Sequence, residues 1–221
     1  MLKNYMEKKK RGRPVQSHGK KEEIRSNIIR VAKRLFAEEG YDHISIRKIA
    51  QQAECAPRTI YYYFKNKREL LNHLWLDIFK LVNDRCEKSA MGVTDPVEII
   101  RRYYTAYVQY WLENPEHFRV IFMNEDLDAT ETHDEKIYGN ILEQAGFVTR
   151  MVHLIQGCIE QGVFVERRKE IIFQTLLLSA HGLSSGLITL REVPWESSTE
   201  LIHSTLDALV SGIRKIKTCL D

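Results

Sequence analysis

The sequence predicts an all-α protein of about nine helices, in which an N-terminal helix-turn-helix head is joined to a larger helical-bundle body. Along most of the 221 residues, apolar side chains recur at the three- and four-residue spacing of helices, and no segment shows the alternation of a strand. Helix caps followed by prolines, as in Asp95-Pro96 and Asn114-Pro115, mark helix starts. Charge is also distributed in a way that separates a head from a body.

Lysine and arginine are concentrated in the first third of the chain. Residues 1–70 carry 18 Lys and Arg against 8 Asp and Glu, whereas the remaining residues carry 15 against 22. This division is typical of a protein in which one domain binds a polyanion and the other does not. The expected domains are a basic, flexible arm (1–21), a helix-turn-helix head (22–68) and a helical body (69–221).

Three short helices are expected in the head. The first carries an apolar stripe and ends at Gly40, a residue suited to a C-terminal cap. Ser45 is a good N-cap for a second helix over 46–53, and Pro57 suits the first position of a third helix that runs to Phe64. The short turn between these two helices predicts a helix-turn-helix, whose second helix can enter a major groove.

The body is expected to contain longer helices. Asn66 and Glu69 resemble a capping box at the start of a helix over 67–90. The two cap and proline pairs predict helix starts near 96 and 115. Further helices are expected over 134–162, 167–191 and 196–217.

Composition and motifs exclude several other classes of protein. With 43% hydrophobic residues the chain can bury a core, and it has neither an apolar run of membrane-spanning length nor a secretory signal, so we expect a cytoplasmic location and no membrane contact. The cysteines have no paired spacing and the acidic run over 124–135 lacks a calcium-loop pattern, so no metal is expected. No cofactor and no catalytic residue are expected, because no phosphate loop or nucleophile motif occurs.

Side chains of the third predicted helix divide between two faces. Ile60 and Phe64 share the face toward the preceding helix. The other side presents Arg58, Thr59 and Tyr62, with Tyr61 and Tyr63 on its flanks. Packing is the simpler explanation for a single tyrosine, but the ring of Tyr62 would be exposed without a partner. We therefore favour DNA contact, in which arginine suits guanine, the tyrosine ring edge suits a thymine methyl group and the hydroxyls suit phosphate oxygens.

The segment FAEEGYDHISIRKIAQQAECAPRTIYYYFKNKRELL (36–71) resembles the head of the tetracycline-repressor (TetR) family of bacterial transcriptional regulators. The motifs SIRKIA, TIYYYF and KNKRELL carry the resemblance, which is specific over the first third of the chain and rests on helix pattern beyond it. The resemblance implies a two-fold dimer whose heads lie in successive major grooves of double-stranded DNA. It also implies bodies that bind a small-molecule effector and each other.

The resemblance also assigns roles by position. It implies phosphate contacts for Ser45, Tyr61, Tyr63 and Lys67, and base-facing positions for Arg47, Arg58, Thr59 and Tyr62. Two residues depart from the family pattern, because Glu54 stands where a glycine is usual and Ala56 stands where a serine cap is usual. Pro57 can compensate by fixing the first helical φ.

The basic stretch KKKRGRP (8–14) ends in RGRP, which resembles an AT-hook core. In that motif, arginines on either side of a glycine lie extended in a narrow A·T minor groove, where negative potential is greatest. Because the arm precedes the predicted head, we favour minor-groove insertion by Arg11 and Arg13. A nonspecific clamp on phosphates is the alternative.

The helix that starts near 96 is aromatic on one face. That face carries Ile100, Tyr103, Tyr104, Tyr107 and Trp111, and the opposite face carries Arg101, Arg102, Thr105 and Gln109. Ordinary core packing is the alternative, but buried tyrosine hydroxyls each need a partner, which favours a ligand pocket with a few polar points. The expected pocket residues are Tyr103, Tyr107, Trp111, Phe122, Phe147 and Met151.

The last two predicted helices have the composition of an interface. Residues 171–190 include no charged side chain apart from a possible His181, so this helix must be buried on several sides. A second apolar stripe follows over 196–217. Burial within one body is the alternative, but the resemblance favours a homodimer through the helices near 167–191 and 196–217.

Together, these observations predict a sequence-specific DNA-binding transcriptional regulator, a repressor that a small-molecule effector releases from a palindromic operator. When bound to DNA, it would lie in the bacterial nucleoid. A sequence-nonspecific architectural DNA-binding protein is one alternative, although the acidic body would then have no role. An enzyme with its site in the helical body is another alternative, but no motif supports it.

Overall fold

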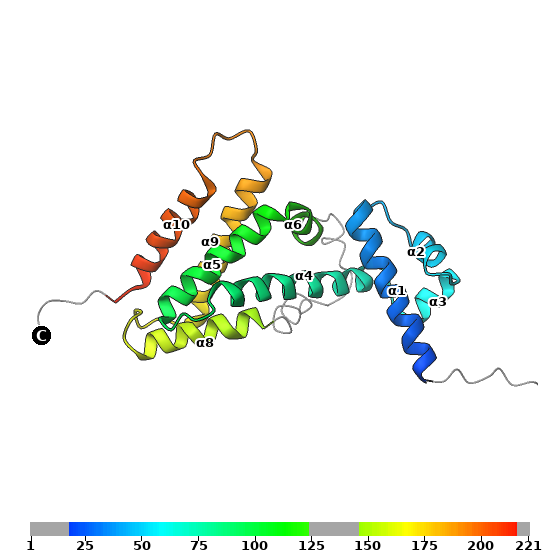
Figure 1. The fold of residues 1–221 in the computed structure, drawn as a ribbon, viewed down its shortest axis with the longest axis horizontal. Coiled ribbons are helices and arrows are strands. Elements are labelled where there is room, and N and C mark those ends of the chain that lie inside the picture. The colour runs from blue at the N-terminus through cyan, green and yellow to red at the C-terminus, as the bar shows by residue number, and fades with distance from the viewer. Residues whose placement is uncertain (1–17, 124–145, 216–221) are drawn as a thin grey trace, which may run out of the picture.

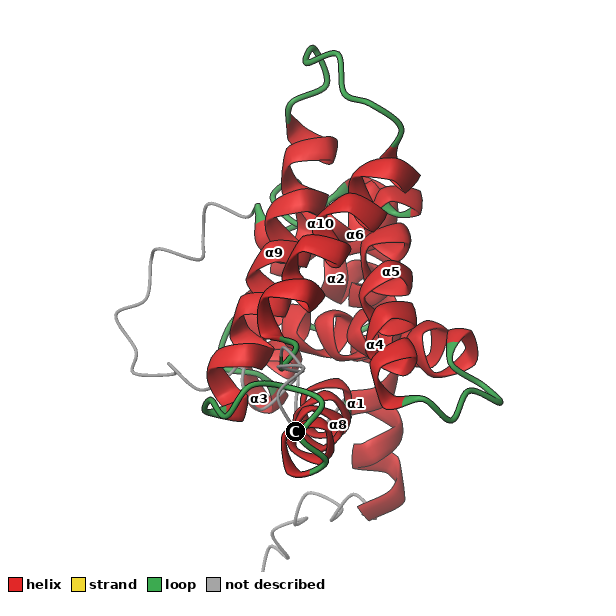
Figure 2. Ribbon diagram, turned by 90° about the vertical axis from the view of Figure 1, so that its left-hand side faces the viewer, coloured by secondary structure: helices red, strands yellow, loops and turns green. Residues whose placement is uncertain are grey.

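The computed structural model describes residues 18–123 and 146–215, and within these ranges it contains nine helices (Figures 1 and 2). The same ranges contain no strand beyond an isolated antiparallel bridge between Phe164 and Arg214. One long and two short helices form a head, and the other six form a larger body. The predicted all-α class with an N-terminal helix-turn-helix head is therefore confirmed.

The head consists of α1 (His18–Glu39), α2 (Ile46–Gln52) and α3 (Pro57–Tyr63) around one small apolar core. This core is built from the buried side chains Ile28, Phe36, Ile49, Ile60 and Phe64. Ser45 caps α2, because its hydroxyl oxygen accepts from the N–H of Lys48 at 3.2 Å. Pro57 occupies the start of α3, where the missing N–H has no helical partner to lose.

The turn between α2 and α3 contains a left-handed residue. Glu54 has a φ of 52°, and no other non-glycine residue in the described ranges has a positive φ. The turn is held by the N–H of Cys55, which donates to the carbonyl of Ala50 at 2.9 Å, and by the side chain of Asn27, which donates to the carbonyl of Ala53 at 3.2 Å. Glycine adopts such a φ without steric cost, which gives a physical reason for the glycine of the family pattern.

The body is built on α4 (Lys67–Ser89), which starts in the head and continues along the body (Figure 1). The body also contains α5 (Pro96–Glu113), α6 (Pro115–Phe122), α8 (Phe147–Glu160), α9 (Lys169–Thr189) and α10 (Ser198–Ile213). The helix predicted over 134–162 is described only from Phe147 onward, since 134–145 lies outside the described residues. α5 is the central helix, because it contacts α4, α6, α8, α9 and α10.

Side-chain contacts of α4 join the head to the body. Lys33 of α1 forms an ion pair with Asp77 of α4. Two residues earlier on α4, the indole N–H of Trp75 donates to the carbonyl of Val120 in α6 at 3.1 Å. α4 is therefore tied to the first helix of the head and to α6 of the body within three residues of its own length.

α9 is buried on part of its circumference only. Within the described ranges it is the one helix with the length and apolar composition of a membrane span, yet it packs on α5, α8 and α10. On its outer side, Leu178 is 69% exposed and Ile171 is 41% exposed. α9 is thus buried on several sides, as predicted, but a single chain leaves one of its apolar sides exposed. Ile202 and Leu206 of the predicted second stripe are buried within the protomer.

Candidate functional site

The outer side of α3 exposes two aromatic rings. Tyr61 and Tyr62 are 60% and 69% exposed, whereas Ile60 and Phe64 are buried against the head. The ring of Tyr63 is partly buried and meets that of Tyr62 edge-on, with centroids 4.9 Å apart. Exposed apolar groups that gather on one surface mark an interaction site. The division of the helix into a packed side and an outward side agrees with the sequence.

Polar and basic side chains accompany these rings. Arg47 of α2 and Arg58 of α3 are exposed, and Thr59 is partly buried. Ser45 is exposed at the start of α2, where its oxygen already accepts from the N–H of Lys48. A hydroxyl has one hydrogen to donate as well, so Ser45 can cap the helix and donate to a phosphate oxygen together. Arg11 and Arg13 lie outside the described residues.

Lys67 differs from the other implied phosphate contacts, because its ammonium group binds to Tyr41 within the same chain. Its Nζ donates to the carbonyl of Tyr41 at 3.0 Å and lies 3.8 Å from the centroid of the Tyr41 ring. The hydrogen bond and the cation–π contact hold the group against the head. An ammonium group has further N–H donors beyond the one that Tyr41 accepts.

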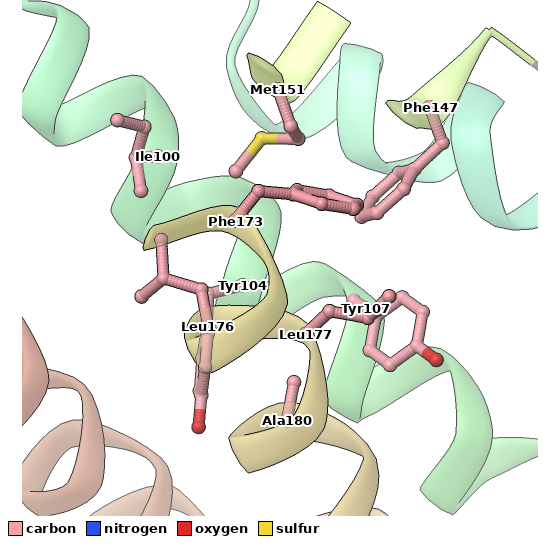
Figure 3. Close-up of a pocket in the computed structure, with 9 residues that line it drawn as sticks. All are labelled: Ile100, Tyr104, Tyr107, Phe147, Met151, Phe173, Leu176, Leu177 and Ala180. Carbon is pink, nitrogen blue, oxygen red and sulfur yellow. The ribbon is translucent and has the colours of Figure 1, made fainter. Parts of the chain in front are cut away.

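The body contains an apolar cavity between α5, α8 and α9 (Figure 3). Its volume is about 20 Å³, and only apolar atoms line it. The lining residues are Ile100, Tyr104, Tyr107, Phe147, Met151, Phe173, Leu176, Leu177 and Ala180. A volume of this size holds roughly one water molecule, so the surrounding side chains nearly fill the cavity.

Three of the six expected pocket residues, Tyr107, Phe147 and Met151, line this cavity, and the other three do not. Instead, Tyr103 packs on Phe147 with ring centroids 6.1 Å apart. Trp111 and Phe122 pack on each other at 5.4 Å, in an aromatic cluster with Phe79 and Phe118. The aromatic face of α5 is thus divided between cavity wall and ordinary core.

α9 supplies four lining residues that the sequence did not indicate: Phe173, Leu176, Leu177 and Ala180. A helix that is apolar nearly all round gives no signal for which side faces a cavity. Ile100 and Tyr104 were on the predicted aromatic face but were not assigned to the pocket. Tyr104 lies one turn and Ile100 two turns before Tyr107 on the same face, and this was the signal that could have included them.

The polar atoms of the cavity wall point away from its centre. The hydroxyls of Tyr104 and Tyr107 lie at the periphery (Figure 3), and that of Tyr104 is 3.1 Å from the hydroxyl of Ser179. Burial raises the pKa of both phenols, so both are neutral at physiological pH. Close by, Trp111 Nε1 and Tyr103 Oη are buried and make no hydrogen bond of normal length in the described part of the chain, although Tyr107 approaches the indole and Glu87 and Arg150 approach the Tyr103 hydroxyl.

A helix-turn-helix head with an exposed aromatic and basic helix, joined to a helical body with an apolar cavity, defines a DNA-binding regulator with a separate ligand-binding part. The model of the tetR family of bacterial regulatory proteins matches residues 28–74. The chain belongs to this family, as similarity over nearly its whole length shows. It is a DNA-binding transcriptional regulator and not an enzyme.

Two relatives and one solved structure illustrate that similarity. A fatty acid metabolism regulator protein of Bacillus subtilis is 30% identical over 84% of this chain and 93% of the relative. An uncharacterized HTH-type transcriptional regulator of Haemophilus influenzae is 33% identical over 88% of this chain and 98% of the relative. The crystal structure of a TetR-family transcriptional regulator from Haemophilus influenzae is 25% identical, with a TM-score of 0.58 over 90% of this chain and 100% of that chain.

Proposed function

We propose that the protein is a homodimeric repressor that binds a palindromic operator and that a small-molecule effector releases it. The observation that carries the DNA-binding surface is the exposure of Tyr61 and Tyr62 beside Arg58, on a helix whose other side is buried. The functional parts predicted over 1–21, 22–68 and 69–221 are an arm, a DNA-binding head and a ligand-binding and dimerisation body, with the difference that the first helix of the head begins at His18 and so takes in the last four residues of the predicted arm. In the dimer, two α3 helices about 34–36 Å apart would enter successive major grooves.

On this surface, side chains divide between bases and backbone. The base edges are contacted by Arg47, Arg58, Thr59 and Tyr62. The phosphates are contacted by Ser45, Tyr61, Tyr63 and Lys67. Arg58 suits guanine, because a guanidinium matches its two acceptors at once. Arg11 and Arg13 extend the contact into the flanking minor groove. The protein would lie at the nucleoid of a bacterial cytoplasm while bound.

The dimer interface that we propose is formed by α9 and α10. Its support is the apolar side of α9 around Leu178, which one chain leaves uncovered. On α10, the small residues Ser204, Ala208 and Gly212 are exposed and permit close approach of a partner helix. In a dimer, α9 and α10 of both protomers would form four helices around a two-fold axis and would bury the apolar side of α9 and the small residues of α10.

The effector that we propose for the cavity carries an apolar chain. Support comes from the wholly apolar lining and from the Bacillus subtilis relative, whose name refers to fatty acid metabolism. A cavity of about 20 Å³ has to expand before it can hold such a molecule, since ligand sites commonly measure about 300–1,000 Å³. Separation of α8 and α9 from α5 would provide the volume.

Expansion of the cavity would reach the DNA through α4. α5 packs along α4, and α6, the helix after α5, accepts the hydrogen bond of Trp75. The ion pair between Lys33 and Asp77 links α4 in turn to α1 of the head. An effector can shift the spacing of the heads only by the difference between its affinities for the two arrangements.

The test of DNA binding is a selection of genomic fragments with the full chain at near-physiological salt, followed by footprinting of the selected site. We expect one palindromic site with protected A·T-rich flanks. In the variant Arg58→Gln, loss of a bidentate guanine contact should weaken specific binding by about 1–3 kcal/mol and relax the preference at one position of each half-site.

The matched control is Arg119→Gln, which removes another exposed arginine, from α6 of the body. Binding to the operator should be unchanged in this variant. If the selected fragments share only a high A·T content, or if the two substitutions have equal effects on binding, α3 is rejected as the base-reading helix. The architectural alternative would then remain.

A further inference from the structure

A second space in the body is far larger than the apolar cavity and lies on the opposite side of α5. It is a groove of about 380 Å³ between the C-terminal end of α4, the polar face of α5 and α10. The sequence predicted that Arg101, Arg102, Thr105 and Gln109 would share a face opposite the aromatic one. Because α10 crosses beside that face, these side chains line a groove instead of an open surface.

Hydrogen-bond donors are concentrated in this groove. The side chains of the consecutive residues Arg101 and Arg102 line it, together with Thr105 and Gln109 of α5 and His203 of α10. Glu98 is the one carboxylate among the lining residues, and Asp207 pairs with Arg101 from the edge. A site with this composition is suited to a ligand that accepts hydrogen bonds.

Intramolecular contacts hold the two arginines in place without using all their donors. Arg101 donates through one terminal nitrogen to Asp207. Arg102 donates from Nε to Glu98 at 3.0 Å and from a terminal nitrogen to the carbonyl of Ser89 at 3.2 Å. A guanidinium group has more N–H donors than these contacts use.

The two carboxylates that pair with Arg101 and Arg102 do not block the groove. The side chains of Glu98 and Asp207 are 42% and 61% exposed. Each carboxylate uses only part of a guanidinium group, so an anion can bind beside these ion pairs through the remaining N–H donors. The contacts thus orient the arginines before a ligand arrives, which lowers the entropy cost of binding.

We propose that this groove is a binding site for a small anionic metabolite with carboxylate or phosphate groups, separate from the effector cavity. Planar guanidinium groups match both oxygens of a carboxylate or two oxygens of a phosphate. Thr105 and Gln109 bind further oxygens of the same molecule, and α10 closes one side. The volume suits a molecule of metabolite size.

The test is calorimetric titration of the full chain with malonate and, separately, with inorganic phosphate, at an ionic strength held constant with sodium chloride. We expect saturable binding of one probe anion per protomer, and the stronger probe distinguishes a carboxylate site from a phosphate site. Absence of saturable binding of both anions at millimolar concentrations would overturn the proposal.

The diagnostic variant is Arg101→Lys combined with Arg102→Lys, which keeps both positive charges but removes the planar donor pairs. Affinity for the better probe should fall at least tenfold, whereas the control Arg119→Lys should bind as the unmodified protein does. Unchanged affinity in the double variant would refute the site. Should that variant fail to fold, Thr105→Val serves instead, with an expected loss of severalfold.

A partner chain is the competing occupant of the groove, because α10 also carries the proposed dimer face. Sedimentation of the double variant separates the two possibilities. A dimer of unchanged stability that no longer binds the anion supports the proposal. A variant that dissociates into monomers would show that the groove belongs to the interface, and the ligand site would then be rejected.

Discussion

Replacement of Glu54 by glycine should stabilise the head. The residue has a φ of 52°, where the Cβ atom crowds the following carbonyl oxygen at a cost of roughly 1–2 kcal/mol. Glycine removes this cost, but its unfolded chain has more conformational freedom, which costs about 0.4–1 kcal/mol. The expected net gain in the free energy of unfolding is about 0.5–1 kcal/mol.

The assay is urea denaturation of the full chain, followed by circular dichroism at pH 7.5. The comparison variant is Glu54→Ala, which removes the same carboxylate but keeps the Cβ atom and therefore the strain. Its free energy of unfolding should stay within about 0.5 kcal/mol of the unmodified protein. The difference between the two variants isolates the backbone contribution from that of the charge.

Equal stability of the glycine and alanine variants would refute this reasoning, as would a loss of stability in the glycine variant. Either result would mean that the hydrogen bonds around the turn, from Cys55 to Ala50 and from Asn27 to Ala53, relieve the conformation fully. DNA affinity of both variants should rise slightly and equally, since each removes one negative charge from the basic head.

Four further outcomes are expected. Deletion of residues 1–14 should weaken operator binding and lower its dependence on salt, and an unchanged slope in a salt titration would exclude a role for the arm. Leu178→Glu should dissociate the dimer in sedimentation experiments, whereas Leu81→Glu, at an exposed leucine of α4, should not. Trp75→Phe should lower the free energy of unfolding by about 0.5–1.5 kcal/mol, because the hydrogen bond from the indole to the carbonyl of Val120 is lost, and should reduce the response to effector in a DNA-release assay. Burial lowers the pKa of His181 below its ordinary value of 6.5, so the folded state binds its proton less readily than the unfolded chain; stability should fall as the pH drops below about 6.5, and His181→Gln should flatten this fall in denaturation curves.

Local signals predicted the helices well. α5 and α6 begin at the prolines that follow Asp95 and Asn114, and the Asn66 side chain accepts from the N–H of Glu69 at 2.9 Å as the capping pattern predicted. Such signals act between residues a few positions apart, so they are contained in short stretches of sequence.

The two sides of α5 show where sequence patterns stop being informative. Their aromatic and polar character followed from spacing, but the neighbours that complete each site come from α9 and α10, far along the chain. α9 is apolar on nearly every side, so its pattern could not indicate that Phe173 and Leu176 face the cavity. The polar side of α5 had the pattern of a solvated face, and only the position of α10 makes it a groove.

The length of α4 amplifies small rotations at its body end. A continuous helix of 23 residues is about 34 Å long. If its body end is held by α5, a tilt of only about 6° displaces the head end by about 3.5 Å, close to the rise of one base pair. A small tilt of α4 at the cavity would therefore move α3 along the DNA by about one base pair.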